Sequence, residues 1–482
     1  MFDAGVFENF AKKVTSFIAL AAMFFSLLFN PGNGKPLTLS EGNRIILEKG
    51  IVLQAWVPAS ASGDKCLPAQ ELKELGFGPT YYESNMFNPA IHEAYPDIPW
   101  SLAQAPTGGG SSTVKPSGEE WMSAEQLKYA NSLISVCFGD ENAYSKDQTE
   151  IFRQWFDDFR SRHCGVLLHS NQWCGQWTKK QMTDYMKTAK PDLLTFDSYY
   201  FDEGENPTED YEMGAVLADS INSFRKSAMA GCDGSGNSPI PFGQYLLGFK
   251  TGGSPPDTGR YEITESQKNA VANMTLTMGG KWLNLFRIIY GDFFLLYDSE
   301  GKPTRHYYEY AALNKEIMNV SPHLSKLQTT DVRVIRGSHK GALNLTVKNA
   351  FPKSVFGFSR FNSYGLQNIK VRNTGSENDG LNGDVYIGYF KTLPGAAFES
   401  GKQRDYFALC NALATGNGLL PQDQHGSCTE TGQEITLCVD SETAKKLYFV
   451  NAQTGETEQA AVHAGEYKFT LGGGKMRVFF WE

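Results

Sequence analysis

Two adjacent carboxylates, Asp140 and Glu141, stand where an apolar stretch of the chain ends. The stretch runs from Leu133 to Phe138, and Gly139 and Asn142 enclose the acidic pair. Short apolar runs bounded by turn-forming residues are typical of buried parallel strands. Carboxyl groups at a strand end can exchange protons with a substrate, and a neighbouring negative charge raises their proton affinity. The simpler alternative is that both acids cap the first turn of the following helix.

A third carboxylate, Asp197, lies within the apolar segment Pro191–Phe201, PDLLTFDSYYF. A carboxylate in such surroundings must be functional or belong to a buried ion pair. Glycoside hydrolysis requires a proton donor and a second group that stabilises or attacks the anomeric carbon. We therefore expect Glu141 to act as general acid/base and Asp197 as nucleophile or base, while Asp140 tunes or orients the reacting groups.

Polar and aromatic side chains follow the other strand-like segments. Each of them is more often structural than functional, but together they resemble the hydrogen-bonding groups and stacking platforms of a sugar subsite. The predicted substrate-binding residues are Trp56, Glu83, Gln104, Asn171, Trp173, Tyr199, Gln244, Tyr245 and Arg287.

Residues 45–328 alternate between strand-like and helix-like segments. Eight parallel strands, mostly followed by helices, form the pattern of an α/β protein with a (β/α)8 TIM barrel, whose chemistry lies at the C-terminal strand ends. The expected strands are Gly50–Val57, Pro79–Asn85, Ser101–Pro106, the segment beginning at Leu133, Gly165–Trp173, Asp192–Phe201, Ile240–Phe249 and Lys281–Ile289. The expected helices are Pro68–Leu75, Ser123–Ser132, Lys146–Arg162, Thr178–Ala189, Tyr211–Ala230, Thr264–Met278 and Thr304–Leu327, and long loops are expected at Met86–Trp100 and Gly108–Gly118.

Residues 330–482 have a different pattern of short alternating stretches separated by Gly, Asn and Asp turns. This pattern predicts an antiparallel C-terminal β-sandwich of about eight strands. The segment Glu377–Asp384, ENDGLNGD, is rich in oxygen ligands, but its spacing does not fit an EF-hand loop and favours a plain turn. The expected strands are Val332–Arg336, Ala342–Val347, Val355–Phe361, Gly383–Phe390, Glu434–Val439, Lys446–Val450, Glu466–Leu471 and Lys475–Trp481.

The composition of this 482-residue chain indicates which classes of partner it can bind. A net charge of −9 and the absence of a basic patch argue against nucleic acid. The aromatic content of 13% can fill cores, and aromatic rings also line sugar-binding clefts. We expect a carbohydrate as the partner. No motif implies an organic cofactor, and no CxxC pair or His cluster suggests a zinc site.

The first 34 residues read as a signal peptide or an uncleaved membrane anchor. Lys12 and Lys13 precede the mostly apolar run Val14–Phe29, which is short for a membrane span. A buried core helix is the alternative. Export would make the protein secreted, periplasmic or attached to the cell surface, and the eight cysteines could then form disulfides. The pairs close in sequence are Cys164 with Cys174 and Cys428 with Cys438.

The barrel half resembles the clan A-type glycoside hydrolases through three local motifs. These are GDEN at Gly139–Asn142, the segment Pro191–Phe201 and the run Arg260–Ile289. In clan A the acid/base Glu ends the fourth strand, where Glu141 is expected. The chain is also similar to a group of secreted bacterial barrel proteins with Asp-Glu on strand four, Asp-x-Tyr on strand six and Gln on strand seven. The resemblance implies an exported hydrolase of O-glycosidic bonds in an oligo- or polysaccharide.

Two positions depart from the clan A pattern. Asp140 stands where clan A has Asn, and Gln244 stands where it has the nucleophilic Glu. Asp197 could replace the missing nucleophile, or it could be the base of an inverting enzyme. Similarity to family 20 and family 123 hexosaminidases suggests a further route, in which Glu141 is the acid and Asp140 orients a substrate acetamido group that itself attacks. A tyrosine such as Tyr199 or Tyr245 would belong to the same site. The alternative from another class is a non-catalytic carbohydrate-binding barrel protein.

Overall fold

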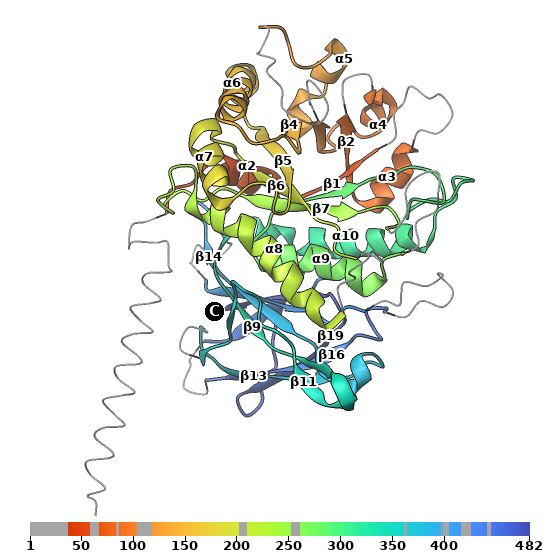
Figure 1. The fold of residues 1–482 in the computed structure, drawn as a ribbon, viewed down its shortest axis with the longest axis vertical. Helices are drawn as coiled ribbons and strands as arrows, with labels where there is room; N and C mark the ends of the chain where they lie inside the picture. Colours follow the sequence, from red (N-terminus) through yellow and green to blue (C-terminus); the bar gives the residue numbers. More distant parts are fainter. Residues whose placement is uncertain are drawn as a thin grey trace, which may run out of the picture.

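The structure is a computed structural model that describes residues 37–57, 67–82, 86–103, 118–201, 210–251, 261–360, 364–396, 398, 404–415, 426–440 and 445–482 (Figure 1). Eight parallel strands close into a barrel in sequence order, with β1 paired to both β2 and β8. The predicted (β/α)8 barrel is therefore confirmed. Its strands are β1 (Val52–Trp56), β2 (Gly78–Tyr82), β3 (Trp100–Ala103), β4 (Leu133–Asp140), β5 (Leu167–Trp173), β6 (Leu194–Asp197), β7 (Phe242–Leu247) and β8 (Trp282–Phe286).

Helices surround the barrel where the amphipathic patterns placed them. On α6, the apolar residues Ile151, Trp155 and Phe159 recur at helical spacing and are buried. Thr178 caps α7 by accepting a hydrogen bond from the backbone of Gln181, and the Gln181 side chain bonds back to the cap. The helices are α2 (Glu41–Lys49), α3 (Ala69–Leu75), α4 (Pro89–Ala94), α5 (Ala124–Leu127), α6 (Lys146–Arg162), α7 (Lys179–Ala189), α8 (Asp210–Ala230), α9 (Glu265–Thr277) and α10 (Arg305–Leu324).

The structure corrects two expectations in the first third of the barrel. The segment Met86–Trp100 is not an open loop, because Asn88 caps the short helix α4 and β3 already begins at Trp100. Within α4, His92 is buried and its ring stacks on Phe87 with centroids 4.7 Å apart, so the helix closes the base of this loop. The helix expected at Ser123–Ser132 is divided into α5 and a 3-10 turn.

The C-terminal region forms two packed sheets, which confirms the predicted β-sandwich. A seven-stranded sheet has the order β12-β9-β14-β15-β20-β17-β18, and a three-stranded sheet has the order β13-β16-β19. The first sheet comprises β12 (Phe356–Gly357), β9 (Leu327–Ile335), β14 (Val385–Thr392), β15 (Tyr406–Asn411), β20 (Met476–Trp481), β17 (Leu447–Val450) and β18 (Thr457–Gln459). The second comprises β13 (Leu366–Asn373), β16 (Gln433–Val439) and β19 (Glu466–Leu471), and β10 (Ser338–Lys340) pairs with β11 (Thr346–Lys348) as a separate hairpin.

Several strands of this domain differ from the prediction. β13 and β15 lie in stretches where no strand was expected. The predicted strand Ala342–Val347 begins instead as a 3-10 turn with Leu343 in the left-handed region, so only its end enters β11. In the segment Glu377–Asp384 the structure has a 3-10 turn at Asn378–Gly380, in line with the plain turn that the spacing favoured.

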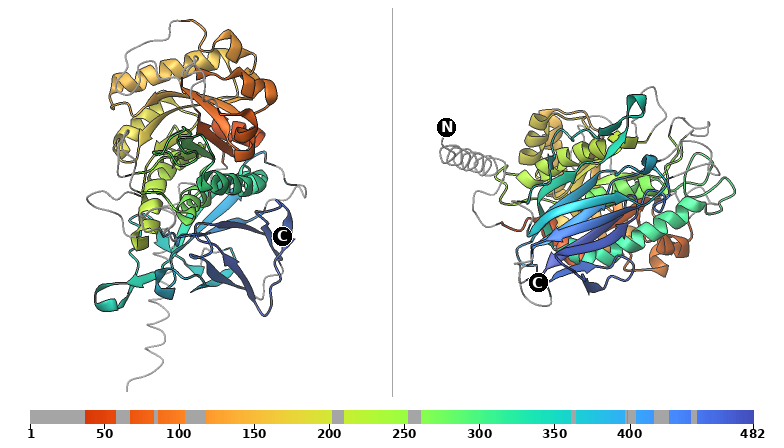
Figure 2. Two further views of the ribbon diagram at one scale, coloured as in Figure 1. Left: turned by 90° about the vertical axis from the view of Figure 1, so that its right-hand side faces the viewer. Right: turned by 90° about the horizontal axis from the view of Figure 1, so that it is seen from below.

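Both faces of the seven-stranded sheet are packed against other parts of the protein, and this packing joins the barrel to the β-domain. Alternate residues of β14 and β15, such as Ile387 and Leu409, pack in the core shared with the three-stranded sheet. Their neighbours Tyr386 and Cys410 pack in the large core that includes the barrel helices. Figures 1 and 2 show α8 and α9 between the barrel strands and this sheet. The β-domain is therefore fixed against the barrel by a shared apolar layer.

Helix α9 is the buried centre of this contact. Every residue from Ser266 to Thr277 is buried, although the segment contains many polar side chains. These polar groups must find partners inside the protein. The Gln267 amide donates to the Tyr261 hydroxyl at 2.7 Å, and the Asn273 amide donates to the carbonyl of Gly474 at 3.0 Å.

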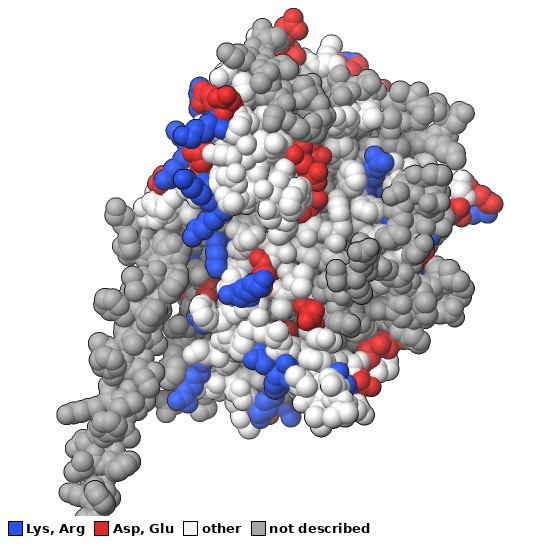
Figure 3. Space-filling view, viewed as in Figure 1, with Lys and Arg blue, Asp and Glu red and all other residues white. Residues whose placement is uncertain are grey.

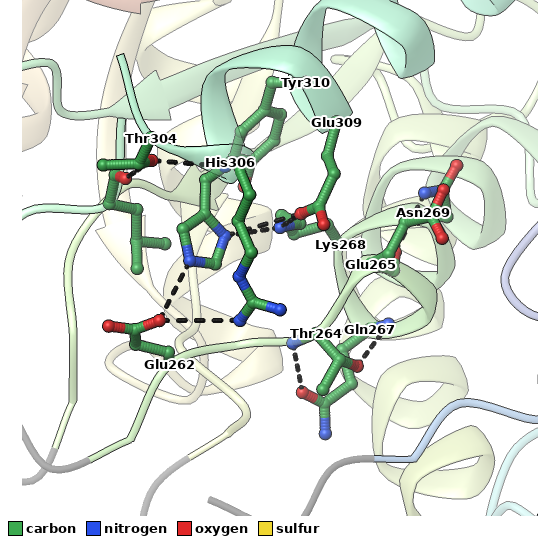
Figure 4. A network of polar contacts seen from close by, with 12 residues as sticks. Glu262, Thr264, Glu265, Gln267, Lys268, Asn269, Thr304, His306, Glu309 and Tyr310 are labelled. Atoms are coloured by element: carbon green, nitrogen blue, oxygen red, sulfur yellow. Dashed lines mark hydrogen bonds and ion pairs between the residues drawn. The ribbon is translucent and has the colours of Figure 1, made fainter. Parts of the chain in front are cut away.

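Lys268, on α9, belongs to a buried charge network (Figure 4). Its ammonium group pairs with Glu309 and lies 2.6 Å from Nδ1 of His306, while Nε2 of that ring is 3.2 Å from Glu262. Lys250 pairs with the other oxygen of Glu262 at 2.7 Å. Burial raises the pKa of Glu262, but the hydrogen bonds from His306 and Lys250 outweigh it and lower the pKa to about 2. The network ties α9 and α10 to the segment that begins at residue 261.

The expected disulfides are not formed among the described cysteines. Cys137, Cys164, Cys174, Cys232, Cys410, Cys428 and Cys438 are all free thiols, so both sequence-near pairs were wrong. Cys438 lies within β16, whereas Cys428 precedes that strand. Closeness in sequence therefore did not bring the two thiols into bonding contact. Cys66 and residues 1–34 lie outside the described residues. Across the described ranges, we find no helix with the length and apolarity required to cross a membrane.

We predict that Lys268→Met lowers the free energy of unfolding by about 3 kcal/mol, because Glu309 then remains in the protein interior without its cation. Lys268→Met combined with Glu309→Leu should recover part of the loss. Urea denaturation at pH 7 measures both. Lys128→Met is the control, since Lys128 is 62% exposed in its pair with Glu125 and its replacement should leave the stability essentially unchanged. Equal effects of the two single substitutions would contradict the assignment.

Candidate active site

One amide joins two of the three predicted carboxylates. Nδ2 of Asn171, on β5, donates to Asp140 at 3.0 Å and to Asp197 at 2.8 Å. Asp140 ends β4 and Asp197 ends β6, so the three residues come from adjacent strands of the barrel. Because the C-terminal ends of parallel strands meet at one rim, the two carboxylates lie close together on either side of Asn171.

Glu141 reaches the same rim because the backbone changes direction at the GDEN motif. The pairing between β4 and β5 is irregular between Cys137 and Asp140, and Glu141 has a φ of 51°, in the left-handed region. Its N–H donates to the carbonyl of Asn171 at 3.0 Å. Gly139 permits this path, since a Cβ there would meet Oδ1 of Asn142 and lie 2.7 Å from the Phe152 ring. The irregularity places two neighbouring carboxylates at one rim, which a regular strand would not do.

The next residue, Asn142, secures the end of the motif. Its carbonyl accepts a hydrogen bond from the Trp177 indole at 3.1 Å and one from the Gln176 amide at 3.2 Å. Both donors lie between β5 and α7. The segment after β5 therefore holds the GDEN turn in place, and Glu141 itself is left exposed.

Burial favours the protonated form of all three carboxyl groups, and like-charge repulsion adds to this for Glu141 and Asp197. Burial raises the pKa of Asp197, the negative charge of Asp140 adds to this, and the hydrogen bond from Asn171 opposes it. The pKa of Asp140 is raised by burial and lowered in part by Asn171. For Glu141, partial desolvation and then the charges of Asp197 and Asp140 raise the pKa. A carboxyl group that keeps its proton at higher pH is suited to general acid catalysis.

Aromatic rings surround this rim. Trp56, at the end of β1, stacks on Tyr82 with ring centroids 5.7 Å apart and contacts Phe286 edge-on at 5.6 Å. Trp173, at the end of β5, is 47% exposed and stands beside Asp197 in the register of β5 and β6. An exposed indole beside the carboxylates offers a flat apolar face for packing.

Two tyrosines and an arginine complete the described part of the site. Tyr199 packs edge-on against Phe249 with centroids 5.0 Å apart, and its pKa is raised by burial and then by the charges of Asp197, Asp140 and Glu141. Tyr245 is buried within the barrel against Trp282. Arg287 follows β8, and its guanidinium lies over the rings of Phe286 and Phe294.

Gln244 is directed away from these residues. Its amide donates to the Val271 carbonyl at 3.3 Å and to the Thr275 hydroxyl, both on α9, and its carbonyl accepts from the Tyr200 hydroxyl at 2.9 Å. Successive side chains of a strand point to opposite faces, so Gln244 and Tyr245 cannot both face the barrel interior. Gln244 therefore serves the contact between barrel and helix. Glu83 and Gln104 lie outside the described residues.

Some aromatic residues at this rim were not predicted, because their positions depend on strand register. Tyr82 and Phe286 both pack on Trp56, and alternation along β2 and β8 was the available signal for them. Asn171 was expected to touch substrate, but its amide hydrogen-bonds to the two aspartates. Among the residues that the structure describes, no group of three His, Cys, Asp or Glu side chains is arranged to hold a metal ion.

Comparison with protein-family models and with curated protein sequences finds no match. Among solved structures, the chain is similar to a 4-O-α-L-rhamnosyl-β-D-glucuronidase from Fusarium oxysporum, at 12% identity and a TM-score of 0.41 over 89% of this chain and 97% of that one. It is also similar to a glucosidase from Croceicoccus marinus, at 8% identity and a TM-score of 0.38 over 90% and 96% of the two chains. An α-L-arabinofuranosidase from Thermotoga maritima matches at 10% identity and a TM-score of 0.38, over 90% and 93%. These similarities are too low to assign a function.

We predict that Asp197→Asn stabilises the protein at pH 7. A carboxyl group whose pKa is raised on folding binds protons more tightly in the folded state, so its contribution to stability falls as the pH rises above the unfolded value, 3.8 for Asp. The uncharged amide removes this cost, and the gain should be on the order of 1 kcal/mol. Thermal unfolding at pH 7 and at pH 3.5 tests the prediction, since the gain should disappear at the lower pH. A loss of stability at pH 7 would refute it.

Proposed function

We propose that the protein is a glycoside hydrolase that cleaves O-glycosidic bonds of an oligo- or polysaccharide. The observation that carries the proposal is the convergence of Glu141, Asp140 and Asp197 at the C-terminal rim of the barrel, with Asn171 between the two aspartates. Protonation of the leaving oxygen and stabilisation or attack at the anomeric carbon require two such groups.

In this proposal Glu141 is the general acid/base. It is exposed, so a substrate can reach it, and the charges of Asp197 and Asp140 support its protonated form. After the leaving group departs, the Glu141 carboxylate can accept a proton from water. Its position at the end of β4 results from the left-handed backbone conformation after Asp140.

Asp197 is the nucleophile or the base. It is 8% exposed, and the hydrogen bond from Asn171 fixes one of its oxygens. As a nucleophile it would attack the anomeric carbon and form a glycosyl ester while the leaving oxygen takes the proton of Glu141; water would then cleave the ester. As a base it would instead take a proton from the attacking water. Asp140 shares the Asn171 amide and so orients Asp197, and Trp173 provides a stacking surface for a sugar ring.

A non-catalytic carbohydrate-binding protein would use the aromatic rings without the acids. Gathering three carboxyl groups of raised pKa costs stability, and a binding surface has no need of this arrangement. The hydrolase is therefore the better reading. We retain an exported location as part of the proposal, with residues 1–34 as signal peptide or anchor.

We predict that Glu141→Gln lowers kcat by about 10²- to 10⁴-fold on glycosides with poor leaving groups, because no proton reaches the departing oxygen. The loss should be much smaller for aryl glycosides with strongly acidic phenols, which leave without protonation. Steady-state kinetics on a series of aryl glycosides and on polysaccharides measures the difference. Glu125→Gln, an exposed carboxylate on α5, is the matched control. Unchanged hydrolysis in Glu141→Gln would exclude the mechanism.

We further predict that Asp197→Gly loses activity by a similar factor and that azide restores it if Asp197 is the nucleophile. NMR of the product then shows a glycosyl azide of inverted configuration, whereas the wild type retains the configuration of the substrate. Inversion by the wild type would identify Asp197 as the base. Retention that depends on an N-acetyl group, with Asp197→Gly still active, would favour the route in which Asp140 orients the substrate.

A further inference from the structure

Arg287 differs from the other described arginines of the barrel. Five of them pair with a carboxylate within ion-pair distance, and Arg225 is hydrogen-bonded to Thr329 and Asn222. Among the described residues, the Arg287 guanidinium has neither an ion pair nor a hydrogen-bond acceptor, and its buried Nε is unpartnered. The paired arginines are Arg44, Arg153, Arg160, Arg162 and Arg305.

The contacts of Arg287 are aromatic. Its guanidinium lies 5.3 Å from the ring centroid of Phe286 and 5.7 Å from that of Phe294. These rings hold the cation and provide no charge compensation. A partly buried guanidinium without an anion is unfavourable unless a ligand supplies the anion.

A chain of rings connects Arg287 to the carboxylates. Phe286 contacts Phe249 at 6.3 Å between centroids, and Phe249 contacts Tyr199 at 5.0 Å. The Tyr199 hydroxyl interacts electrostatically with Asp140, Glu141 and Asp197, and also with Arg287. Tyr199 therefore stands between the acidic part of the rim and Arg287.

We propose that Arg287 binds the carboxylate of a uronic acid residue, so that the substrate of the hydrolase is an acidic glycan. The inference rests on the proposed function. The ionised carboxyl groups of the site repel an anionic sugar unless a cation faces it, and Arg287 is placed to do so beyond Tyr199. The planar guanidinium matches a carboxylate with two parallel hydrogen bonds, a geometry that an ammonium group cannot reproduce.

The test uses uronic acid polysaccharides and the same polymers after their carboxyl groups have been reduced to alcohols. Reducing-end release measures hydrolysis, and affinity electrophoresis of Glu141→Gln measures binding without turnover. We expect at least one acidic polymer to be preferred over its reduced counterpart. Arg287→Met should lower that preference by about 10- to 100-fold, and Arg287→Lys should be intermediate.

Arg153→Met removes the same charge from the exposed face of α6 and should leave the preference unchanged. Thermal unfolding of Arg287→Met separates loss of recognition from loss of folding. The inference is overturned if no acidic polymer is preferred, if the preference survives Arg287→Met, or if a sulfated neutral polymer is preferred over every uronic acid polymer.

The outcomes also separate this inference from the proposed function. Hydrolysis of neutral polymers that depends on Glu141 would keep the hydrolase and exclude the acidic substrate. Binding of an acidic polymer that depends on Arg287, without hydrolysis of any polymer, would keep the recognition and exclude the enzyme.

Discussion

The hydrogen bonds from Asn171 to Asp140 and Asp197 are the interaction on which the candidate site depends. Two like charges at one end of a barrel repel each other, and burial increases the free-energy cost of keeping both groups ionised. One amide group donates to both and so fixes their separation and their orientation. The backbone of the same residue accepts the N–H of Glu141, so the three acids are held by a single residue of β5.

The second constraint is the burial of α9. Because the helix lies between β7 and the seven-stranded sheet, its polar groups require internal partners, and Gln244 and Glu309 are among them.

The charges carried by the described residues of the outer surface are mixed. On the face in Figure 3, Lys and Arg side chains lie along one edge of the barrel and over the β-domain, with acidic side chains between them. Charges of both signs therefore lie close together on this face.

One part of the rim is acidic and another carries a cation, because these residues come from different strands. The acids end β4 and β6, whereas Arg287 follows β8, and the aromatic rings of Phe249 and Phe286 lie between them. A ligand that spans the rim would meet the carboxyl groups at one end and the Arg287 cation at the other. In the proposed hydrolase, this separation would combine acid catalysis with recognition of an anion at one barrel end, because the aromatic side chains keep the charges from pairing with each other.

Local sequence patterns were enough to predict the barrel, its long helices and the three carboxylates. Helical spacing placed α6, capping residues placed the start of α7, and the apolar run before Asp140 identified β4, because these signals are local. Which side chains are in contact depends on the tertiary structure. Adjacent strand residues face opposite sides, so Gln244 turns to α9 while Tyr245 turns inward. The irregularity between Cys137 and Asp140 brings Glu141 to the same rim as Asp140. Asn171 bridges two aspartates, and Arg287 has no acidic partner among the described residues. Both facts depend on register and on distances across the barrel, which local patterns do not encode.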